Sequence, residues 1–450
     1  MKMKLIYTGA FVSFLALAGC QKKLDVTPTQ SIDVQNALST SSGVLTALNG
    51  AYADLGNASF FGGDTYLYSD LLADAGEIRW NGTYAGLTQI YNKSIPKNNS
   101  FVASTWLQGY KVVNDVNNVL NALNVVDATQ KDRVEGEAKF IRGSVYFELV
   151  RLFARAWNDG NPATNLGVPL VLAPTTGITD ASKVSRNTVA DVYAQAIKDL
   201  TEAEAKLPVT NGFYATKYSA AGMLARIYLQ KADYTNAAAA ANRVIASGKY
   251  SLASTFAGAF PASTSAQVPN TSEDVFAMQV TTTQGTNDLY TFYSPSSRGD
   301  IDIRPAHLAL YETGDQRKAF FVTSGGSVYT AKHNSRYANV RIMRLAEMYL
   351  IRAEANFRSG TAVGDTPLND INKIRNRSGL PSLTAAQLDL NAILKERKLE
   401  LAFEGASLHD VKRLQGTVGV LAWNSFKLVF PIPDREIIAN PNLVQNEGYQ

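Results

Sequence analysis

The sequence predicts a mostly α-helical protein with about four pairs of helices, long irregular insertions and a few short strands. The chain has 450 residues, of which 46% are hydrophobic and 18% charged, so it can bury a large core. Apolar residues recur at three- and four-residue spacing in several segments, as they do on amphipathic helices. A large residue, then a smaller one, then a tyrosine three positions further on form a motif that returns in four of these segments, at residues 48–52, 142–146, 224–228 and 345–349.

The clearest pair of helices is predicted at residues 217–250. Each half carries one apolar stripe, which it can turn toward the other half. The small residues Ala225 and Ala237 allow the two axes to approach closely, with a tight turn at 231–233 and a stop at Gly248. This arrangement is typical of tetratricopeptide (TPR) repeats, which have a period of about 34 residues.

The same reasoning assigns the rest of the chain. An amphipathic helix is expected at 189–207, capped by Asn187 or Thr188 and stopped by Pro208. Further helices are expected at 34–55, 105–123, 132–156, 341–358, 368–377 and 385–404, a short one at 66–75, and strands at 273–281 and 427–432. Residues 56–100 and 253–340 are expected to form long, aromatic-rich insertions. In a helical-repeat protein such insertions usually carry the function.

The N-terminus predicts export and a lipid anchor. A basic start is followed by an apolar run of about fourteen residues, too short to span a bilayer. The run ends in Leu17-Ala18-Gly19-Cys20, which resembles the lipobox of bacterial lipoproteins, and Cys20 is the only cysteine. We therefore expect a signal peptide at 1–19, lipidation (palmitate) of Cys20 and a flexible tether at 20–34.

Two C-terminal strings resemble the SusD/RagB family of outer-membrane lipoproteins from Bacteroidetes-type bacteria. The strings are residues 394–413 (LKERKLELAFEGASLHDVKR) and 430–449 (FPIPDREIIANPNLVQNEGY). Weaker similarities lie at 136–147, 167–170 and 368–377. The charges of the first string, at Glu396, Arg397, Glu400 and Glu404, have helical spacing and are interpreted as ion pairs that hold the helix in place.

The resemblance implies a protein that binds rather than catalyses. Members of this family sit at the outer membrane on the cell surface. They capture an oligosaccharide, or in some branches a peptide, and deliver it to a TonB-dependent SusC-like transporter. The resemblance divides the chain into an N-terminal region (35–250) with units 1–3 and a C-terminal region (251–450) with unit 4 and the ligand-facing insertions.

The ligand site is predicted from the composition of the insertions. Sugar rings stack on Trp and Tyr, and their hydroxyls pair with Asn, Asp, Gln and Arg. Trp80, flanked by Arg79 and Asn81, has this mixture, and so do the nearby Tyr84 and the later pair Tyr290 and Tyr293. Phe60, Phe61 and Tyr66, by contrast, are expected to be buried.

Three alternatives remain open. A glycoside hydrolase would need paired carboxylates, and Asp70, Asp74 and Glu77 lie together in the first insertion. Asp300 and Asp302 could ligate calcium. A pure adaptor would use the TPR grooves to bind a protein, but would not need aromatic insertions.

Other classes of function are disfavoured. The three histidines, His307, His333 and His409, stand outside any catalytic or metal motif, no phosphate-binding loop is present, and no cofactor or metal site is predicted. A net charge of +4 on 450 residues gives no field for nucleic acid.

Overall fold

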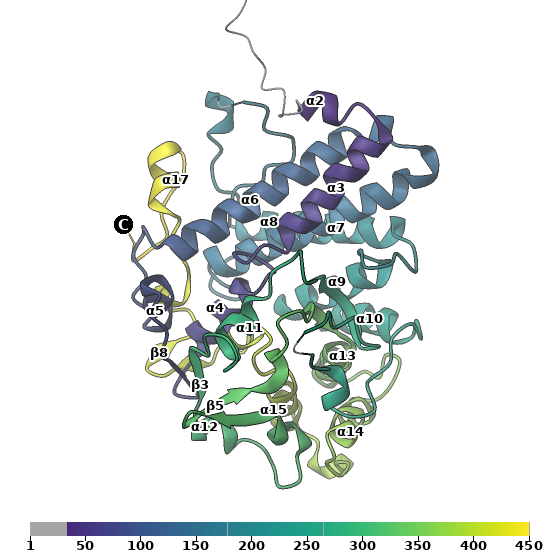
Figure 1. Ribbon diagram of the computed structural model, residues 1–450, viewed down its shortest axis with the longest axis vertical. Helices are drawn as coiled ribbons and strands as arrows, with labels where there is room; N and C mark the ends of the chain where they lie inside the picture. The colour runs from purple at the N-terminus through teal and green to yellow at the C-terminus, as the bar shows by residue number, and fades with distance from the viewer. Residues whose placement is uncertain (1–33, 178, 264, 450) are drawn as a thin grey trace, which may run out of the picture.

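The computed structural model describes residues 34–177, 179–263 and 265–449 (Figure 1). The predicted signal peptide, Cys20 and the tether as far as residue 33 lie outside the described residues. Among the described residues, no helix combines the length and hydropathy needed to cross a membrane.

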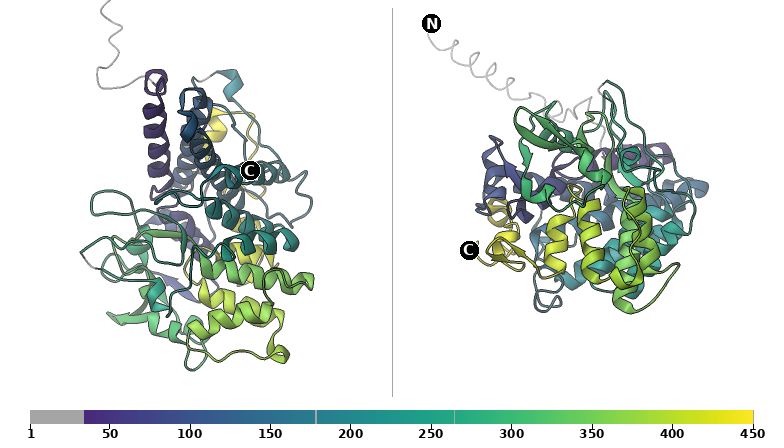
Figure 2. Two further views of the ribbon diagram at one scale, coloured as in Figure 1. Left: turned by 90° about the vertical axis from the view of Figure 1, so that its right-hand side faces the viewer. Right: turned by 90° about the horizontal axis from the view of Figure 1, so that it is seen from below.

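Four pairs of helices form the scaffold, as predicted. Within the pairs, α3 packs on α6, α7 on α8, α9 on α10 and α13 on α14. Successive pairs also pack on one another, and the left panel of Figure 2 shows helices stacked on one side and loops and short strands gathered on the other. The bounds are α3 (Ser41–Leu55), α6 (Ser100–Asn121), α7 (Ala128–Phe153), α8 (Val189–Lys206), α9 (Lys217–Gln230), α10 (Tyr234–Ile245), α13 (Leu345–Ser359) and α14 (Pro367–Arg377).

Local chemistry explains where these helices begin and how closely they pack. Thr188 caps α8: its Oγ1 accepts a hydrogen bond from the Asp191 backbone, and the Asp191 carboxylate accepts one from the Thr188 backbone. Gly143 on α7 touches α8 so closely that a Cβ there would lie 3.0 Å from the Ala196 carbonyl oxygen. Gly143 is the small residue of the motif at residues 142–146, and helix packing therefore requires a small residue at this position.

The remaining elements are short and decorate the scaffold. The helices are α2 (Val34–Ala37), α4 (Asp64–Ala73), α5 (Ala85–Tyr91), α11 (Asp288–Tyr293), α12 (Pro305–Leu308), α15 (Leu390–Glu400), α16 (Ser407–Arg413) and α17 (Asp434–Ala439). The strands are β1 (Ile78–Trp80), β2 (Asp274–Met278), β3 (Ile301–Ile303), β4 (Phe321–Ser324), β5 (Ser327–Thr330), β6 (Val340–Arg344), β7 (Thr417–Val418) and β8 (Leu421–Ala422). They form four antiparallel pairs: β1 with β3, β2 with β6, β4 with β5 and β7 with β8.

The structure corrects three sequence predictions. Residues 340–344 form strand β6, so the helix expected from 341 begins at Leu345, because β2 supplies backbone partners for these five residues. Residues 427–432 are not a strand: the segment is bounded by prolines, and the backbone N–H of Phe430 bonds to the carbonyl of Leu152 on α7 instead. Helix α5 was missed because its apolar stripe has only two buried members.

One large hydrophobic core joins the scaffold to the decorations. Phe60, Phe61 and Tyr66 are buried in it, as predicted. The Tyr66 hydroxyl donates to the carbonyl oxygen of Ile342 on β6, at 3.0 Å. The first insertion is thus fixed to a strand almost 280 positions later in the chain.

Candidate functional site

Trp80 belongs to the core, which corrects the prediction that its ring is an exposed platform. It lies opposite Ile301 in the β1–β3 pair and is only 8% exposed. Its Nε1 donates to Thr88 Oγ1 at 2.9 Å, and its ring lies 5.9 Å from that of Phe292. The ring faces are therefore covered by protein, although both sequence neighbours of Trp80 are exposed.

Tyr293 is fully buried, so its predicted role as a ligand contact is also wrong. Its hydroxyl donates to Asp70 Oδ2 at 2.7 Å. On the short helix α11, Leu289, Phe292 and Tyr293 face the core, whereas Tyr290 is only partly buried. Burial therefore differs between two tyrosines that are only three positions apart on one helix.

Tyr84 is the exposed aromatic ring of the first insertion, with 44% of its surface accessible. Its inner edge packs on Phe101 and Phe292 in T-shaped contacts. The Arg298 guanidinium lies 4.5 Å from the centre of the Tyr84 ring and donates to Thr83 Oγ1 at 3.1 Å. These contacts hold the ring in one orientation and leave part of it open to solvent.

Arg79 on β1 and Asn81 just after it are both exposed, and they precede Tyr84 by five and three positions. Arg79 Nη2 pairs with Asp302 Oδ2 at 2.8 Å. The Asn81 backbone N–H donates to the Asp300 carbonyl at 2.7 Å, which leaves the Asn81 side chain at the surface. We call the surface formed by Arg79, Asn81, Tyr84 and Arg298 the tyrosine edge.

A polar hollow of about 540 Å³ lies beside the tyrosine edge, since its lining residue Ser297 directly precedes Arg298. Tyr290, one of the predicted ligand residues, lines it, and its hydroxyl donates to the Ser296 carbonyl at 3.2 Å. The Arg298 backbone N–H bonds to the Thr291 carbonyl, so the chain folds back from the hollow toward the tyrosine edge. The lining residues of the hollow are Val280–Asn287, Tyr290, Thr291, Ser296, Ser297, Arg336 and Tyr337.

Most of the hollow was missed by the sequence analysis. The run Thr281–Gly285 contains three threonines, a glutamine and a glycine, and has no periodicity. It forms a tight turn, in which Thr281 Oγ1 accepts from the backbone N–H groups of Thr283 and Gln284. Its only sequence signal is a cluster of hydroxyl and amide side chains beside Tyr290.

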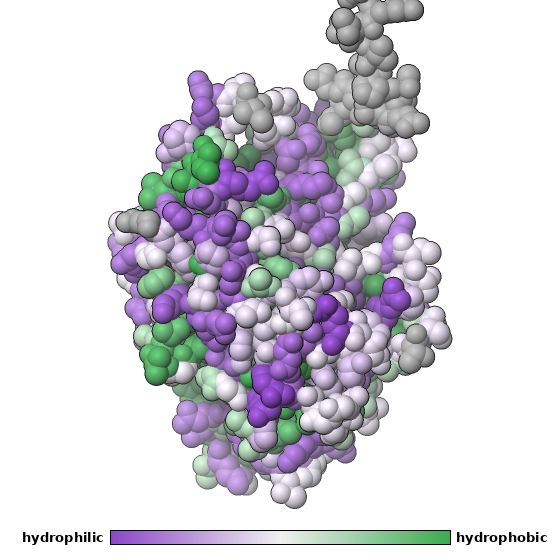
Figure 3. Space-filling view, turned by 60° about the vertical axis from the view of Figure 1, so that its left-hand side comes forward, coloured by the Kyte–Doolittle hydropathy of each residue, from purple (hydrophilic) through white to green (hydrophobic). Residues whose placement is uncertain are grey.

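Figure 3 shows one face of the molecule, on which hydrophobic side chains gather in separate patches among hydrophilic ones.

The three carboxylates of the hydrolase alternative line a different, mainly apolar cavity of about 410 Å³. Asp74 Oδ1 accepts three backbone N–H groups and so caps a turn. Burial raises the pKa of Asp70 to about 6, although the Tyr293 and Ser407 hydroxyls both donate to it. Burial opposes ionisation of Glu77 as well, but hydrogen bonds from His307 and Lys398 outweigh it and lower its pKa to about 2. All three carboxylates thus have structural partners.

Both aspartates of the calcium alternative pair with arginines. Asp300 binds Arg298 at 2.7 Å. Asp302 binds Arg79 and Arg304 and also accepts the Val328 backbone N–H. Within residues 34–177, 179–263 and 265–449, no cluster of three or more His, Cys, Asp or Glu side chains could hold a metal ion.

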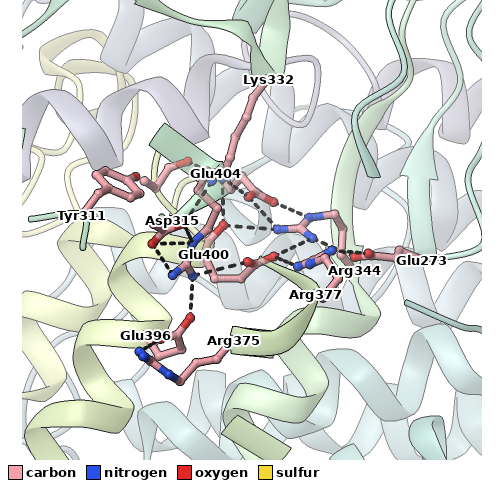
Figure 4. Close-up of polar contacts among 12 residues, drawn as sticks. Glu273, Tyr311, Asp315, Lys332, Arg344, Arg375, Arg377, Glu396, Glu400 and Glu404 are labelled. Carbon is pink, nitrogen blue, oxygen red and sulfur yellow. Dashed lines mark hydrogen bonds and ion pairs between the residues drawn. The ribbon is translucent and has the colours of Figure 1, made fainter. Parts of the chain in front are cut away.

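The charges of the first C-terminal string lie in buried ion pairs, which confirms their interpretation, and several of them form one network (Figure 4). Arg344 lies at the centre: its guanidinium binds Glu404 at 2.7 Å, Glu273 at 2.9 Å and Glu400 at 3.1 Å. Arg377 also pairs with Glu273 and Glu400, while Lys332 binds Glu404 at 2.6 Å. We call the group Glu273, Lys332, Arg344, Arg377, Glu400 and Glu404 the ionic cluster.

Comparisons with known proteins agree with this geometry. One family profile, described as starch-binding and associating with the outer membrane, matches residues 24–229. A second, described as the SusD family, matches residues 309–427, so the two cover more than half of the chain. The chain belongs to the SusD/RagB family.

Individual relatives extend this SusD-family assignment along the whole chain. SusD-like protein P2 of Formosa agariphila is 25% identical, with 97% of this chain and 98% of the relative aligned. Starch-binding protein SusD of Bacteroides thetaiotaomicron is 32% identical over 125 residues, which are 25% of this chain and 22% of that protein.

Solved structures show the same architecture. A putative sugar binding protein from Bacteroides vulgatus superimposes with a TM-score of 0.82 and 27% identity, covering 92% of this chain and 99% of the other. A SusD superfamily protein from Bacteroides thetaiotaomicron gives a TM-score of 0.80 at 25% identity, with 90% and 99% covered. The family is a family of binding proteins.

Proposed function

We propose that this protein is a cell-surface lipoprotein that captures an oligosaccharide or polysaccharide and passes it to a TonB-dependent SusC-like transporter, without catalysing a reaction. The observation that carries the proposal is the polar hollow beside the tyrosine edge, on the irregular side of a SusD-family scaffold. A lipid on Cys20 would keep the protein at the outer membrane, which holds the transporter. A peptide ligand is the second candidate for the same surface.

The chemistry of this surface suits a sugar chain. The exposed part of Tyr84 can stack on the C–H face of one ring, and the partly buried Tyr290 can meet another. Asn81 and the threonines and glutamine of the hollow supply donors and acceptors for hydroxyl groups. By analogy with the stacking of nucleic-acid bases on aromatic side chains, one stacking ring contributes about 1–3 kcal/mol to the binding free energy. Two such rings give a modest affinity, which suits a protein that must release its ligand.

The two regions predicted from the sequence would build this site together. In this proposal, residues 35–250 contribute Arg79 on β1 and Asn81 and Tyr84 in the loop that follows it. Residues 251–450 contribute the polar hollow and Arg298 through α11 and β3. The pairing of β1 with β3 supports the proposal, since it connects the two contributions.

The test is affinity electrophoresis through gels that contain single polysaccharides, with Tyr84→Ala as the variant. We expect retardation by at least one polysaccharide, and a dissociation constant raised about 5- to 150-fold in Tyr84→Ala, because one stacking contact is lost. The matched control is Phe213→Ala: this phenylalanine is 61% exposed but lies in the loop that joins α8 to α9.

Other outcomes favour the alternatives. Retardation that is equal in Tyr84→Ala and in the wild type would contradict the tyrosine edge as a contact. Binding of a peptide mixture, but of no polysaccharide, would favour the peptide ligand. Release of reducing sugar from the gel polysaccharide would favour an enzyme, and binding of protein partners alone would favour an adaptor.

A further inference from the structure

The polar hollow has an unbalanced charge. Its lining contains hydroxyl, amide and phenol side chains and a single charged residue, Arg336. No Asp or Glu is among the residues that line it. A ligand that enters the hollow therefore meets a positive charge without a competing carboxylate.

Arg336 differs from the other arginines on this side of the molecule. Arg79 and Arg304 share Asp302, and Arg298 is paired with Asp300. No carboxylate in the described part of the chain lies within ion-pair distance of the Arg336 guanidinium. It is exposed and lies 5.4 Å from the centre of the Tyr337 ring, so its donors remain available.

Stacking alone cannot dominate recognition inside the hollow. Trp80 and Tyr293, the rings that composition had favoured, are in the core. The two rings that line the hollow, Tyr290 and Tyr337, are partly buried. Hydrogen bonds and charge must therefore supply most of the specificity, and a guanidinium binds carboxylate and sulfate oxygens in bidentate fashion.

From these observations we propose that the polar hollow selects an anionic sugar unit, whose carboxylate or sulfate ester is bound by Arg336. The inference rests on the proposed carbohydrate-binding function and narrows it to acidic glycans. A uronic acid and a sulfated sugar present the same anionic oxygens, so the two sources are separated by experiment.

The experiment uses pairs of polymers that share a backbone and differ in charge. Polygalacturonate and its fully methyl-esterified form test the carboxylate, and dextran sulfate and dextran test the sulfate ester. Dissociation constants are measured by affinity electrophoresis at 150 mM salt for wild type, Arg336→Gln and Arg336→Lys. Arg435→Gln is the control, since this arginine has a 65% exposed side chain and lies on α17.

We expect wild type to bind the anionic member of at least one pair more tightly than its neutral form. Arg336→Gln should lose about 10-fold to 100-fold in affinity for that polymer, because a charge-assisted hydrogen bond is lost. Arg336→Lys should retain part of the affinity, and Arg435→Gln all of it. Thermal unfolding should be unchanged in all three variants, because both arginines are exposed.

Three results would overturn the inference. Equal binding of charged and neutral forms, with Tyr84→Ala still weakening both, would leave the proposed function intact and remove the anionic specificity. Binding of both polyanions that Arg336→Gln does not weaken would show general polyanion attraction instead of a site in the hollow. Failure to bind any polysaccharide would remove both proposals together.

Discussion

The ionic cluster and the polar hollow use charge in opposite ways. In the ionic cluster, Arg344 is 2% exposed and binds three carboxylates, each of which has a further cationic partner. In the hollow, Arg336 is exposed and no carboxylate lines the wall. Within the ionic cluster every charge has an oppositely charged partner, whereas the exposed Arg336 guanidinium has none among the described residues and is available to a ligand. The difference separates the architectural arginines of this family scaffold from a candidate for recognition.

Removal of the central guanidinium should give the largest effect. We expect Arg344→Met to lower the free energy of unfolding by about 3–5 kcal/mol, because Glu273, Glu400 and Glu404 would remain buried with too few cations. Urea denaturation measures this loss. Arg336→Gln should change it by less than about 0.5 kcal/mol. Similar losses of unfolding free energy in Arg344→Met and Arg336→Gln would contradict the difference between the ionic cluster and the hollow.

Trp80, like the ionic cluster, should contribute to the stability of the fold and not to ligand binding. Trp80→Ala should cost about 3 kcal/mol of stability, because it opens a cavity beside Phe292 and leaves Thr88 without its donor. Tyr84→Ala removes a ring that is 44% exposed and should cost clearly less. Urea midpoints of the two variants test this order. An unchanged urea midpoint in Trp80→Ala would contradict burial of the ring and make Trp80 a candidate for ligand contact again.

Acid should weaken the ionic cluster through Glu404. Burial opposes ionisation of this carboxyl, but the ion pairs with Arg344 and Lys332 prevail and hold its pKa well below the usual 4.5. Its contribution to stability is therefore fully present above about pH 4.5 and is lost as the pH falls further. Between pH 4.5 and pH 3, wild type should lose more stability than Arg344→Met does, by up to about 1.5 kcal/mol for this single carboxyl. Parallel curves for wild type and Arg344→Met would contradict this assignment, and Arg336→Gln should follow wild type.

Much of the scaffold could be predicted from local sequence. The period of the apolar residues located the helices, and Thr188 and the 231–233 turn were predicted close to their observed places. The errors arose where a distant segment intervened. Residues 340–344 have the composition of a helix start, yet they form a strand because β2, some 65 positions earlier, supplies its hydrogen bonds. Residues 427–432 have the composition of a strand, yet no neighbouring strand pairs with them.

The site was predicted less well, and for the same reason. The polar neighbours of Trp80 suggested exposure, but its burial depends on Ile301 and Phe292, more than 200 positions away. Arg79, Asn81, Tyr84 and Tyr290 remain candidates for ligand contact, whereas Arg336 and the Thr281–Gly285 turn carried no pattern that could be detected. Hydroxyl-rich loops have no periodicity, so only their position in space reveals a shared surface.

The sequence by itself determined the helical pairs, the family and the expectation of a lipid anchor, because periodicity and short motifs act through neighbours along the chain. Tertiary structure alone decided which rings are covered and that the exposed Arg336 has no carboxylate partner among the described residues. Burial and ion pairing are properties of contacts between distant segments, and such contacts form only when the insertions fold against the scaffold.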